Sequence, residues 1–119
     1  MTATMNGAFG AGEAIRIDAA AAHIAVSRFD RPTLVVDRGR IAQQYDALAE
    51  GLGEARIHYA VKANPAPEII AMLVQRGARF DAASRGEIEL CLSQGAKGSD
   101  ISFGNTVKRP SDIAFAQSV

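Results

Sequence analysis

From residue 56 onward the chain repeats one unit, a short apolar strand followed by an amphipathic helix. Strands are predicted at 56–62, 79–82 and 100–104, so their ends recur about every 21 residues, which leaves room for helices of about 10 residues. Successive strand–helix units run their strands in parallel and connect them by right-handed crossovers. The repeat therefore predicts an α/β fold with a parallel sheet.

The helices of this repeat carry recognisable start and stop signals. We expect them to begin at Asn64-Pro65, at Ser84 and near Pro110, because Asn and Ser cap helix N-termini and proline fits a first turn. Gly77 and Gly95 are expected to end the first two. The apolar positions of the three helices are Ile69, Ile70 and Leu73, then Ile88, Cys91 and Leu92, then Ile113 and Phe115.

Alternation along the strands separates an apolar face from a face of polar and small residues. The second face carries His58, Ala60, Lys62, Arg79, Asp81, Ser102 and Gly104. A doubly wound sheet is covered on both sides and should be apolar on both. A polar face fits the lumen of a closing (β/α)8 barrel better, and such barrels gather reactive groups at the carboxyl ends of their strands. Lys62, Asp81 and Asn105 all lie at such ends, which predicts a site there.

The residues before the repeat are organised differently. Residues 1–14 show no period, and an Ala-rich helix is predicted over Asp18–Arg28. The β-branched run Thr33–Asp37 predicts a strand. A helix with an apolar stripe follows, ended by Gly51 and Gly53; its stripe is Ile41, Tyr45, Leu48 and Leu52. We therefore expect a lead-in over 1–31, partly disordered or a short helix, and the barrel portion over 32–119.

Charge and cysteine content exclude several classes of function. Thirteen basic and thirteen acidic residues with no basic stripe give no electrostatic reason to bind nucleic acid or an anionic membrane. One cysteine, Cys91, cannot form an internal disulfide, which is typical of a cytoplasmic protein, and it is expected to be a buried apolar side chain. No apolar run approaches membrane-spanning length. With two histidines and one cysteine, no metal site is expected.

Lys62 is the candidate reactive group. It follows the apolar run Ile57, Tyr59, Val61, and an amine held short of solvent at a strand end can form an imine with a carbonyl compound. A strand-end lysine that only reaches for water is the ordinary alternative, and it is the commoner one for an isolated lysine.

Three segments resemble the opening of the fold-type III pyridoxal-phosphate decarboxylases, closest to the ornithine decarboxylase branch. They are Tyr59-Ala60-Val61-Lys62-Ala63-Asn64-Pro65, Phe80-Asp81-Ala82-Ala83-Ser84-Arg85-Gly86-Glu87 and Ile101-Ser102-Phe103-Gly104-Asn105-Thr106-Val107-Lys108. The resemblance implies a pyridoxal-phosphate-binding barrel followed by a β-domain, to which Thr33–Asp37 would contribute. It implies an amino-acid decarboxylase, with L-ornithine converted to putrescine for polyamine synthesis, working as a homodimer.

The resemblance also implies residue roles. Lys62 matches the lysine that binds pyridoxal phosphate covalently, and Ala60, Asp81, Glu87 and Asn105 match positions near the cofactor. Three of these residues also fit plain structural roles: Asp81 a helix cap, Asn105 a turn, and Glu87 the last position of the capping box Ser84-Arg85-Gly86-Glu87. The capping box is the better-supported role for Glu87, and the two roles can coexist.

Alternatives remain open for both substrate and activity. Diaminopimelate, lysine or arginine could replace ornithine, because the substrate-reading residues of this family lie further along the chain. A regulator without turnover is a further alternative, which the intact Lys62 argues against. Because three strands cannot close a barrel, we expect a fragment that neither folds stably nor acts alone.

Overall fold

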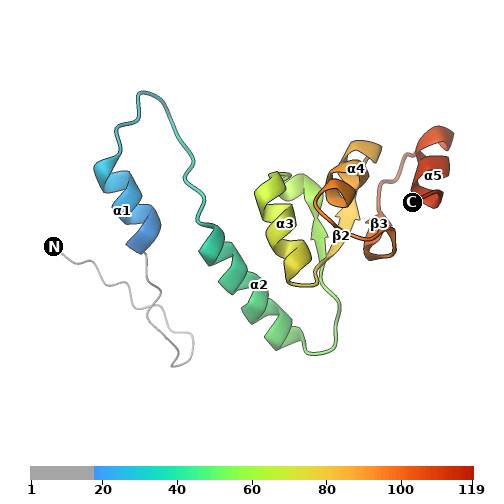
Figure 1. The fold of residues 1–119 in the computed structure, drawn as a ribbon, viewed down its shortest axis with the longest axis horizontal. Coiled ribbons are helices and arrows are strands. Elements are labelled where there is room, and N and C mark those ends of the chain that lie inside the picture. The colour runs from blue at the N-terminus through green and yellow to red at the C-terminus, as the bar shows by residue number, and fades with distance from the viewer. Residues whose placement is uncertain (1–17) are drawn as a thin grey trace. The chain divides into compact units, whose positions relative to one another are not determined.

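The computed structural model describes residues 18–119, which form two compact units divided between Asp37 and Arg38. In the first unit, α1 spans Asp18–Val26 (Figure 1), so the helix expected over Asp18–Arg28 is confirmed. The boundary predicted near residue 32 stays a prediction.

The prediction of a strand at Thr33–Asp37 is wrong. These residues have no regular secondary structure, and Leu34 is 86% exposed. A strand exists only where a neighbour pairs with its backbone, and within residues 18–119 the sheet has three strands, all later in the chain. A β-branched run therefore stays irregular when nothing pairs with it.

The second unit begins with α2, Arg38–Leu52, and Gly53 ends this helix in the left-handed conformation at φ 60°. Only part of the predicted apolar stripe packs. Ile41 and Tyr45 lie against the core, whereas Leu48 and Leu52 are 51% and 47% exposed. Ala42 is buried as well, so the packed face of α2 combines Ala42 with the first half of the predicted stripe.

The sheet contains β1 (His58–Ala60), β2 (Arg79–Ala82) and β3 (Ile101–Phe103), all parallel and in the order β1-β2-β3. The predicted α/β class and parallel arrangement are confirmed. The register places Tyr59, Phe80 and Ile101 in one row and Ala60, Asp81 and Ser102 in the next. Neighbours in register share a face, so the predicted separation into an apolar and a polar face is confirmed as well.

The connecting helices are α3 (Pro67–Gln75), α4 (Arg85–Ser93) and α5 (Pro110–Gln117), with short 3-10 turns η1 (Val61–Ala63) and η2 (Gly98–Asp100). The expected start of α3 at Asn64-Pro65 is wrong. Pro67 is its first residue, because a residue before proline avoids the helical region, and Ala66 is extended at φ −63° and ψ 126°.

The core of this unit lies between the apolar face of the sheet and helices α3 and α4 (Figure 1). Its buried members are Val61, Ile69, Ile70, Leu73, Ala78, Phe80 and Cys91. Cys91 has no exposed surface, as its apolar surroundings predicted. Gly77 and Gly95, at φ 73° and 92°, follow the ends of α3 and α4. The helices therefore cover one face of the sheet and leave the Ala60–Asp81–Ser102 row on the other.

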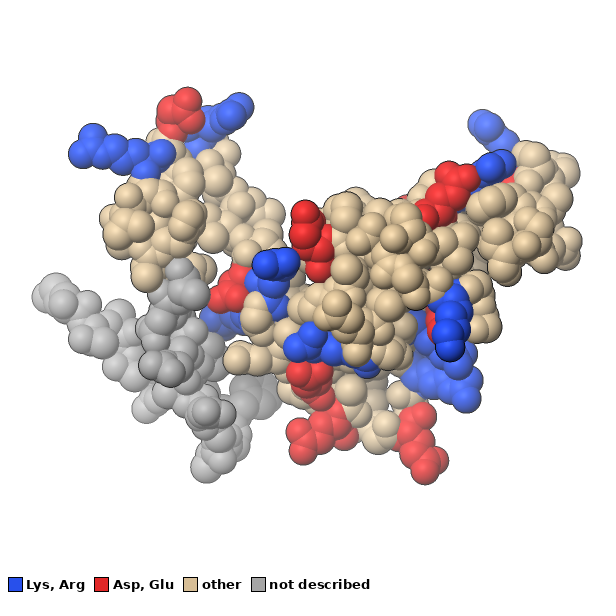
Figure 2. Space-filling view, in the orientation of Figure 1, with Lys and Arg blue, Asp and Glu red and all other residues tan. Residues whose placement is uncertain are grey.

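The surface carries both signs of charge. On the face drawn in Figure 2, Lys and Arg side chains are interspersed with Asp and Glu rather than gathered into one basic patch. Within residues 18–119, no helix has both the length and the apolar character needed to cross a bilayer.

Candidate active site

Lys62 lies just beyond the sheet. β1 ends at Ala60 and not at Lys62 as expected, and the chain continues into η1, where Lys62 is the middle residue. The turn contacts β2, so Lys62 is carried at the carboxyl edge of the sheet. Its side chain is exposed, contrary to the expected partial burial.

Val61, the residue before Lys62 in η1, fixes the turn to the core. Val61 has no exposed surface and belongs to the same buried cluster as Phe80 and Leu73. Because Val61 is buried, the next residue, Lys62, directs its side chain away from the core. The Lys62 side chain is therefore exposed to solvent while the backbone just before it stays attached to the core.

Asp81 lies within β2, in register with Ala60 on one side and Ser102 on the other. It is half-buried, and its carboxylate rests against Gly104, just past the end of β3. A Cβ added to Gly104 would overlap the Asp81 Oδ1 atom and would stand 2.8 Å from Cγ. The missing side chain at position 104 thus makes the space that the Asp81 carboxylate occupies.

Glu87 acts as a helix cap in the structure. The Ser84 hydroxyl accepts the Glu87 backbone N–H at 3.3 Å, and the Glu87 Oε2 atom accepts the backbone N–H of Ala83 at 2.7 Å. The capping interaction predicted from Ser84-Arg85-Gly86-Glu87 is confirmed. Glu87 reaches one residue further back than the capping box requires, to Ala83 instead of Ser84.

The remaining predicted residues lie around the same edge. Ala60 is half-buried beside Asp81, and Asn105 is exposed directly after Gly104. His58 is exposed at the start of β1, where it pairs with Arg79 in the register. The structure therefore brings Ala60, Asp81 and Gly104 together. Lys62 and Asn105 follow the ends of the two outer strands, and within residues 18–119 no hydrogen bond or ion pair joins either side chain to Asp81.

One interaction near Lys62 was not expected from the sequence. The Tyr59 hydroxyl donates a hydrogen bond to the backbone carbonyl of Asn64 at 3.2 Å, across the turn that contains Lys62. Alternation marks Tyr59 only as an apolar-face residue, packed against the core. A hydroxyl at the tip of an otherwise apolar ring is the signal that the alternation pattern hides.

Burial changes the acidity of Cys91. Loss of water around the thiol raises the pKa of Cys91 to about 11, and the Glu87 carboxylate adds to the rise. A thiol with so high a pKa stays protonated at neutral pH and is a poor nucleophile. Cys91 is therefore a packing residue.

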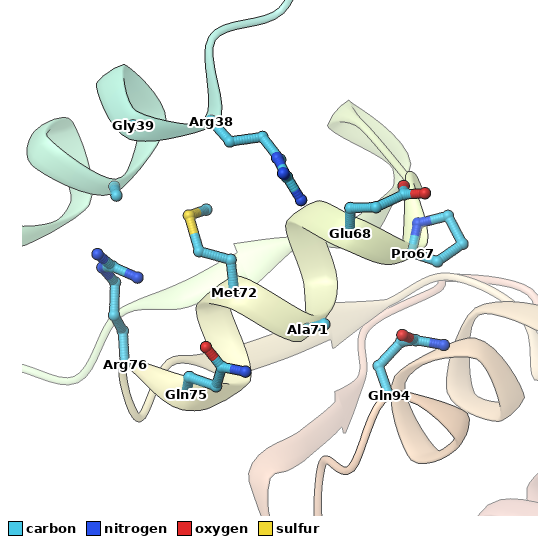
Figure 3. Close-up of a pocket in the computed structure, with 10 residues that line it drawn as sticks. Arg38, Gly39, Pro67, Glu68, Ala71, Met72, Gln75, Arg76 and Gln94 are labelled. Atoms are coloured by element: carbon cyan, nitrogen blue, oxygen red, sulfur yellow. The ribbon is translucent and has the colours of Figure 1, made fainter.

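A hollow within the second unit lies elsewhere. It measures about 560 Å³ and lies between α2, α3 and the end of α4 (Figure 3). Figure 3 shows Met72 pointing from α3 towards α2, with the charged side chains of Arg38, Glu68 and Arg76 around it. None of the five predicted site residues lines this hollow, which lies among the helices. The predicted reactive residues, Lys62 and Asp81, lie at the carboxyl edge of the sheet instead, and that edge is the candidate site.

An α/β unit with an exposed lysine and a half-buried aspartate at the carboxyl edge of parallel strands fits the class of (β/α)8-barrel enzymes, whose active sites lie at that edge. The family profile described as "Pyridoxal-dependent decarboxylase, pyridoxal binding domain" matches residues 38–119. The chain belongs to this family. The resemblance seen in the three sequence segments is confirmed, and pyridoxal phosphate is confirmed as the cofactor of the family.

Relatives with different substrate names are similar to this chain. It is 40% identical to "Ornithine decarboxylase, chloroplastic" of Nicotiana glutinosa, over 75% of this chain and 21% of the relative. It is 36% identical to the diaminopimelate decarboxylase of Pseudomonas aeruginosa, over 77% of this chain and 23% of the relative. The chain thus spans about a fifth of the length of these relatives.

A solved structure supports the same fold. The lysine/ornithine decarboxylase of Vibrio vulnificus, complexed with putrescine, matches with a TM-score of 0.72 and 36% identity. The match covers 82% of this chain and 26% of that one. The predicted fold class, the first portion of a pyridoxal-phosphate-binding barrel, is confirmed.

Proposed function

We propose that this chain supplies the first part of a pyridoxal-phosphate-dependent decarboxylase that acts on a basic amino acid. The observation that carries the proposal is the edge formed by Lys62, Asp81 and Gly104. An amine follows β1, a carboxylate projects from β2, and Gly104, which has no side chain, leaves the space that this carboxylate occupies.

The residues present fit the cofactor. Covalent attachment of an aldehyde requires a primary amine that a flat ring can reach, and Lys62 is exposed at the strand edge. Ala60, next to Asp81 in the register, adds only a methyl group to that face. A small side chain such as that of Ala60 on this face leaves space for a planar ring, which a bulky residue there would fill.

Each residue has a proposed role. When bound, pyridoxal phosphate supplies the electron sink for the pair left when the substrate carboxylate departs as carbon dioxide. Lys62 binds the cofactor covalently and is the catalytic residue. Asp81, held against Gly104, stabilises positive charge on a nearby protonated nitrogen. Asn105 lines the site after β3. Glu87, in the first turn of α4, adds a negative charge near the cofactor.

L-ornithine is the substrate we favour, with putrescine as the product and polyamine synthesis as the context. The 40% identity to a plant ornithine decarboxylase supports this choice. The similarity to a diaminopimelate decarboxylase supports the alternative of another basic amino acid on the same fold. A non-catalytic regulator would not need the amine of Lys62. A homodimer and a cytoplasmic location of the whole protein stay predictions.

The test uses the full-length protein, expressed from the complete reading frame with pyridoxal phosphate. The visible absorbance band of a lysine-bound cofactor is expected in the wild type, together with release of carbon dioxide from ornithine. Lys62→Ala should lose the band and the activity. Lys97→Ala is the matched control, because Lys97 is an exposed lysine in the loop before η2, and it should keep both.

The outcomes separate the alternatives. A band that persists in Lys62→Ala with unchanged intensity would show that another lysine binds the cofactor, and the assignment would be wrong. A band without carbon dioxide release from ornithine, but with release from diaminopimelate, lysine or arginine, would change the substrate and keep the site. Binding without turnover of any of them would favour the regulator.

A further inference from the structure

The turn that carries Lys62 has three attachments, and none involves the Lys62 side chain. Val61 anchors its first residue in the core with no exposed surface. The Asn64 Oδ1 atom accepts the backbone N–H of Ala66 at 3.1 Å, which holds the chain just after the turn. The third attachment is the hydrogen bond from the Tyr59 hydroxyl to the Asn64 carbonyl at 3.2 Å.

The Tyr59 bond differs from the other two because it spans the turn. Tyr59 lies in β1 and Asn64 follows η1, so the bond joins the residue before the turn to the residue after it and closes a loop around Lys62. The ring is partly buried and packs against the core beside Phe80, its register partner. A rigid aromatic ring fixed in the sheet therefore sets where the far end of the turn can lie.

The chemistry of the donor suits a permanent role. Burial raises the pKa of the Tyr59 hydroxyl. The hydroxyl therefore remains protonated and able to donate throughout the neutral range. A typical intramolecular hydrogen bond contributes about 0.5–1.5 kcal/mol, so loss of the donor should loosen the turn.

We propose that Tyr59 is a positioning residue whose hydroxyl, through Asn64, fixes the turn of Lys62 and hence the direction of its amine. The inference rests on the proposed function for its catalytic consequence. The tether itself, a hydroxyl that restrains residues 61–64, is a property of this chain and can be tested without cofactor.

The test compares Tyr59→Phe with Tyr45→Phe in the full-length protein. Tyr45 is a half-buried tyrosine of α2 that packs against the same core, and no hydrogen bond from its hydroxyl is found within residues 18–119. Both variants remove one hydroxyl from a ring at the core. Only Tyr59→Phe removes a bond across the Lys62 turn.

The first measurement is hydrogen–deuterium exchange of the cofactor-free protein. Peptides that cover residues 61–66 should exchange about 2- to 10-fold faster in Tyr59→Phe, the range that loss of one neutral hydrogen bond predicts, and should be unchanged in Tyr45→Phe. Equal exchange of this segment in wild type and Tyr59→Phe would overturn the tether, whatever the cofactor does.

The second measurement is spectroscopic and kinetic, on protein loaded with pyridoxal phosphate. Tyr59→Phe should retain the lysine-bound band, shift the pH at which the band titrates, and lower kcat about 2- to 10-fold with little change in KM. A variant that loses only denaturant resistance, with the titration and kcat of wild type, would make the hydroxyl merely structural. Failure of the proposed function is a separate result, read from Lys62→Ala.

Discussion

The Asp81 carboxylate lies where a side chain at position 104 would have to be, because a Cβ on Gly104 would stand 2.8 Å from the Asp81 Cγ atom. Asp81 belongs to β2 and Gly104 follows β3, so the contact depends on the parallel pairing of these strands. Gly104 has no positive φ that would require glycine. Glycine at position 104 serves instead to leave space for the Asp81 carboxylate.

Gly104→Ala should displace the Asp81 carboxylate. We expect the stability of the full-length protein to fall by at most about 1 kcal/mol, because a short side chain can rotate away, and cofactor affinity to fall more. In an Asp81→Ala background, Gly104→Ala should change cofactor affinity little. A double-mutant cycle on cofactor-binding free energy should therefore give a coupling of about 0.5–3 kcal/mol between the two positions. Cofactor titration and urea unfolding measure the two quantities.

The control for this prediction is Gly86→Ala. A Cβ on Gly86 would meet only the Ser84 Oγ atom at 4.0 Å, so this helix position accepts a methyl group. If Gly104→Ala affects cofactor affinity equally with and without the Asp81 carboxylate, the contact with Asp81 is not the reason for glycine at position 104.

The two roles of Glu87 can be separated by matched substitutions. Glu87→Ala removes the acceptor of the Ala83 N–H and should cost about 1 kcal/mol of stability, as should Ser84→Ala. Glu87→Gln keeps an oxygen acceptor and removes the charge. If Glu87 also contributes charge to the cofactor site, Glu87→Gln should weaken cofactor binding at nearly unchanged stability. Wild-type cofactor affinity in Glu87→Gln would leave Glu87 as a helix cap alone.

Two leucines should respond very differently to the same truncation. Leu73 is 1% exposed in the core and Leu48 is 51% exposed on α2. Leu73→Ala should lower the unfolding free energy by about 2–5 kcal/mol, and Leu48→Ala by less than about 1 kcal/mol. Urea unfolding of the full-length protein measures both. A large loss in Leu48→Ala would mean that residues beyond those described cover Leu48.

Stability should decline at high pH because of Cys91. The pKa of the thiol rises from its ordinary value of 9.0 to about 11 in the folded state, so folding favours the neutral form. This contribution is complete below pH 9.0 and is lost as the pH rises towards about 11. Tyr45 and Tyr59, whose pKa values burial also raises, act in the same direction at higher pH.

The check uses urea midpoints measured between neutral pH and a pH of about 11, the folded-state pKa of the thiol. The decline should be steeper in wild type than in Cys91→Ala, which is less stable overall but has no thiol to ionise. A thiol reagent at mildly alkaline pH should modify Cys91 slowly in native protein and quickly in urea. Fast modification of native protein would show that Cys91 is not buried.

The caps and glycine stops could be predicted from the sequence because each depends on a few adjacent residues. Ser84 caps α4, Gly53 and Gly77 end α2 and α3, and strand alternation predicts which side chains share a face. The start of α3 was predicted too early, although its cause is equally local: Pro67 restricts Ala66 to an extended conformation.

The candidate site was predicted less completely than the fold. The sheet edge and the residues along it were expected, because parallel strands end together. Neither the contact of Gly104 with Asp81 nor the tether from Tyr59 to Asn64 was anticipated. Both depend on how far a side chain extends in space.

Strand and helix order, helix caps and the two faces of the sheet follow from neighbours along the chain, where backbone geometry is decided within a few residues. Burial and pairing are different, because their partners come from distant positions. That is why Thr33–Asp37 has strand composition without being a strand, and why Leu48 shares the apolar stripe of α2 but not its packing. The exposure of Lys62 and the contact of Asp81 with Gly104 depend on the pairing of β1, β2 and β3 in the same way, so only the tertiary structure decides them.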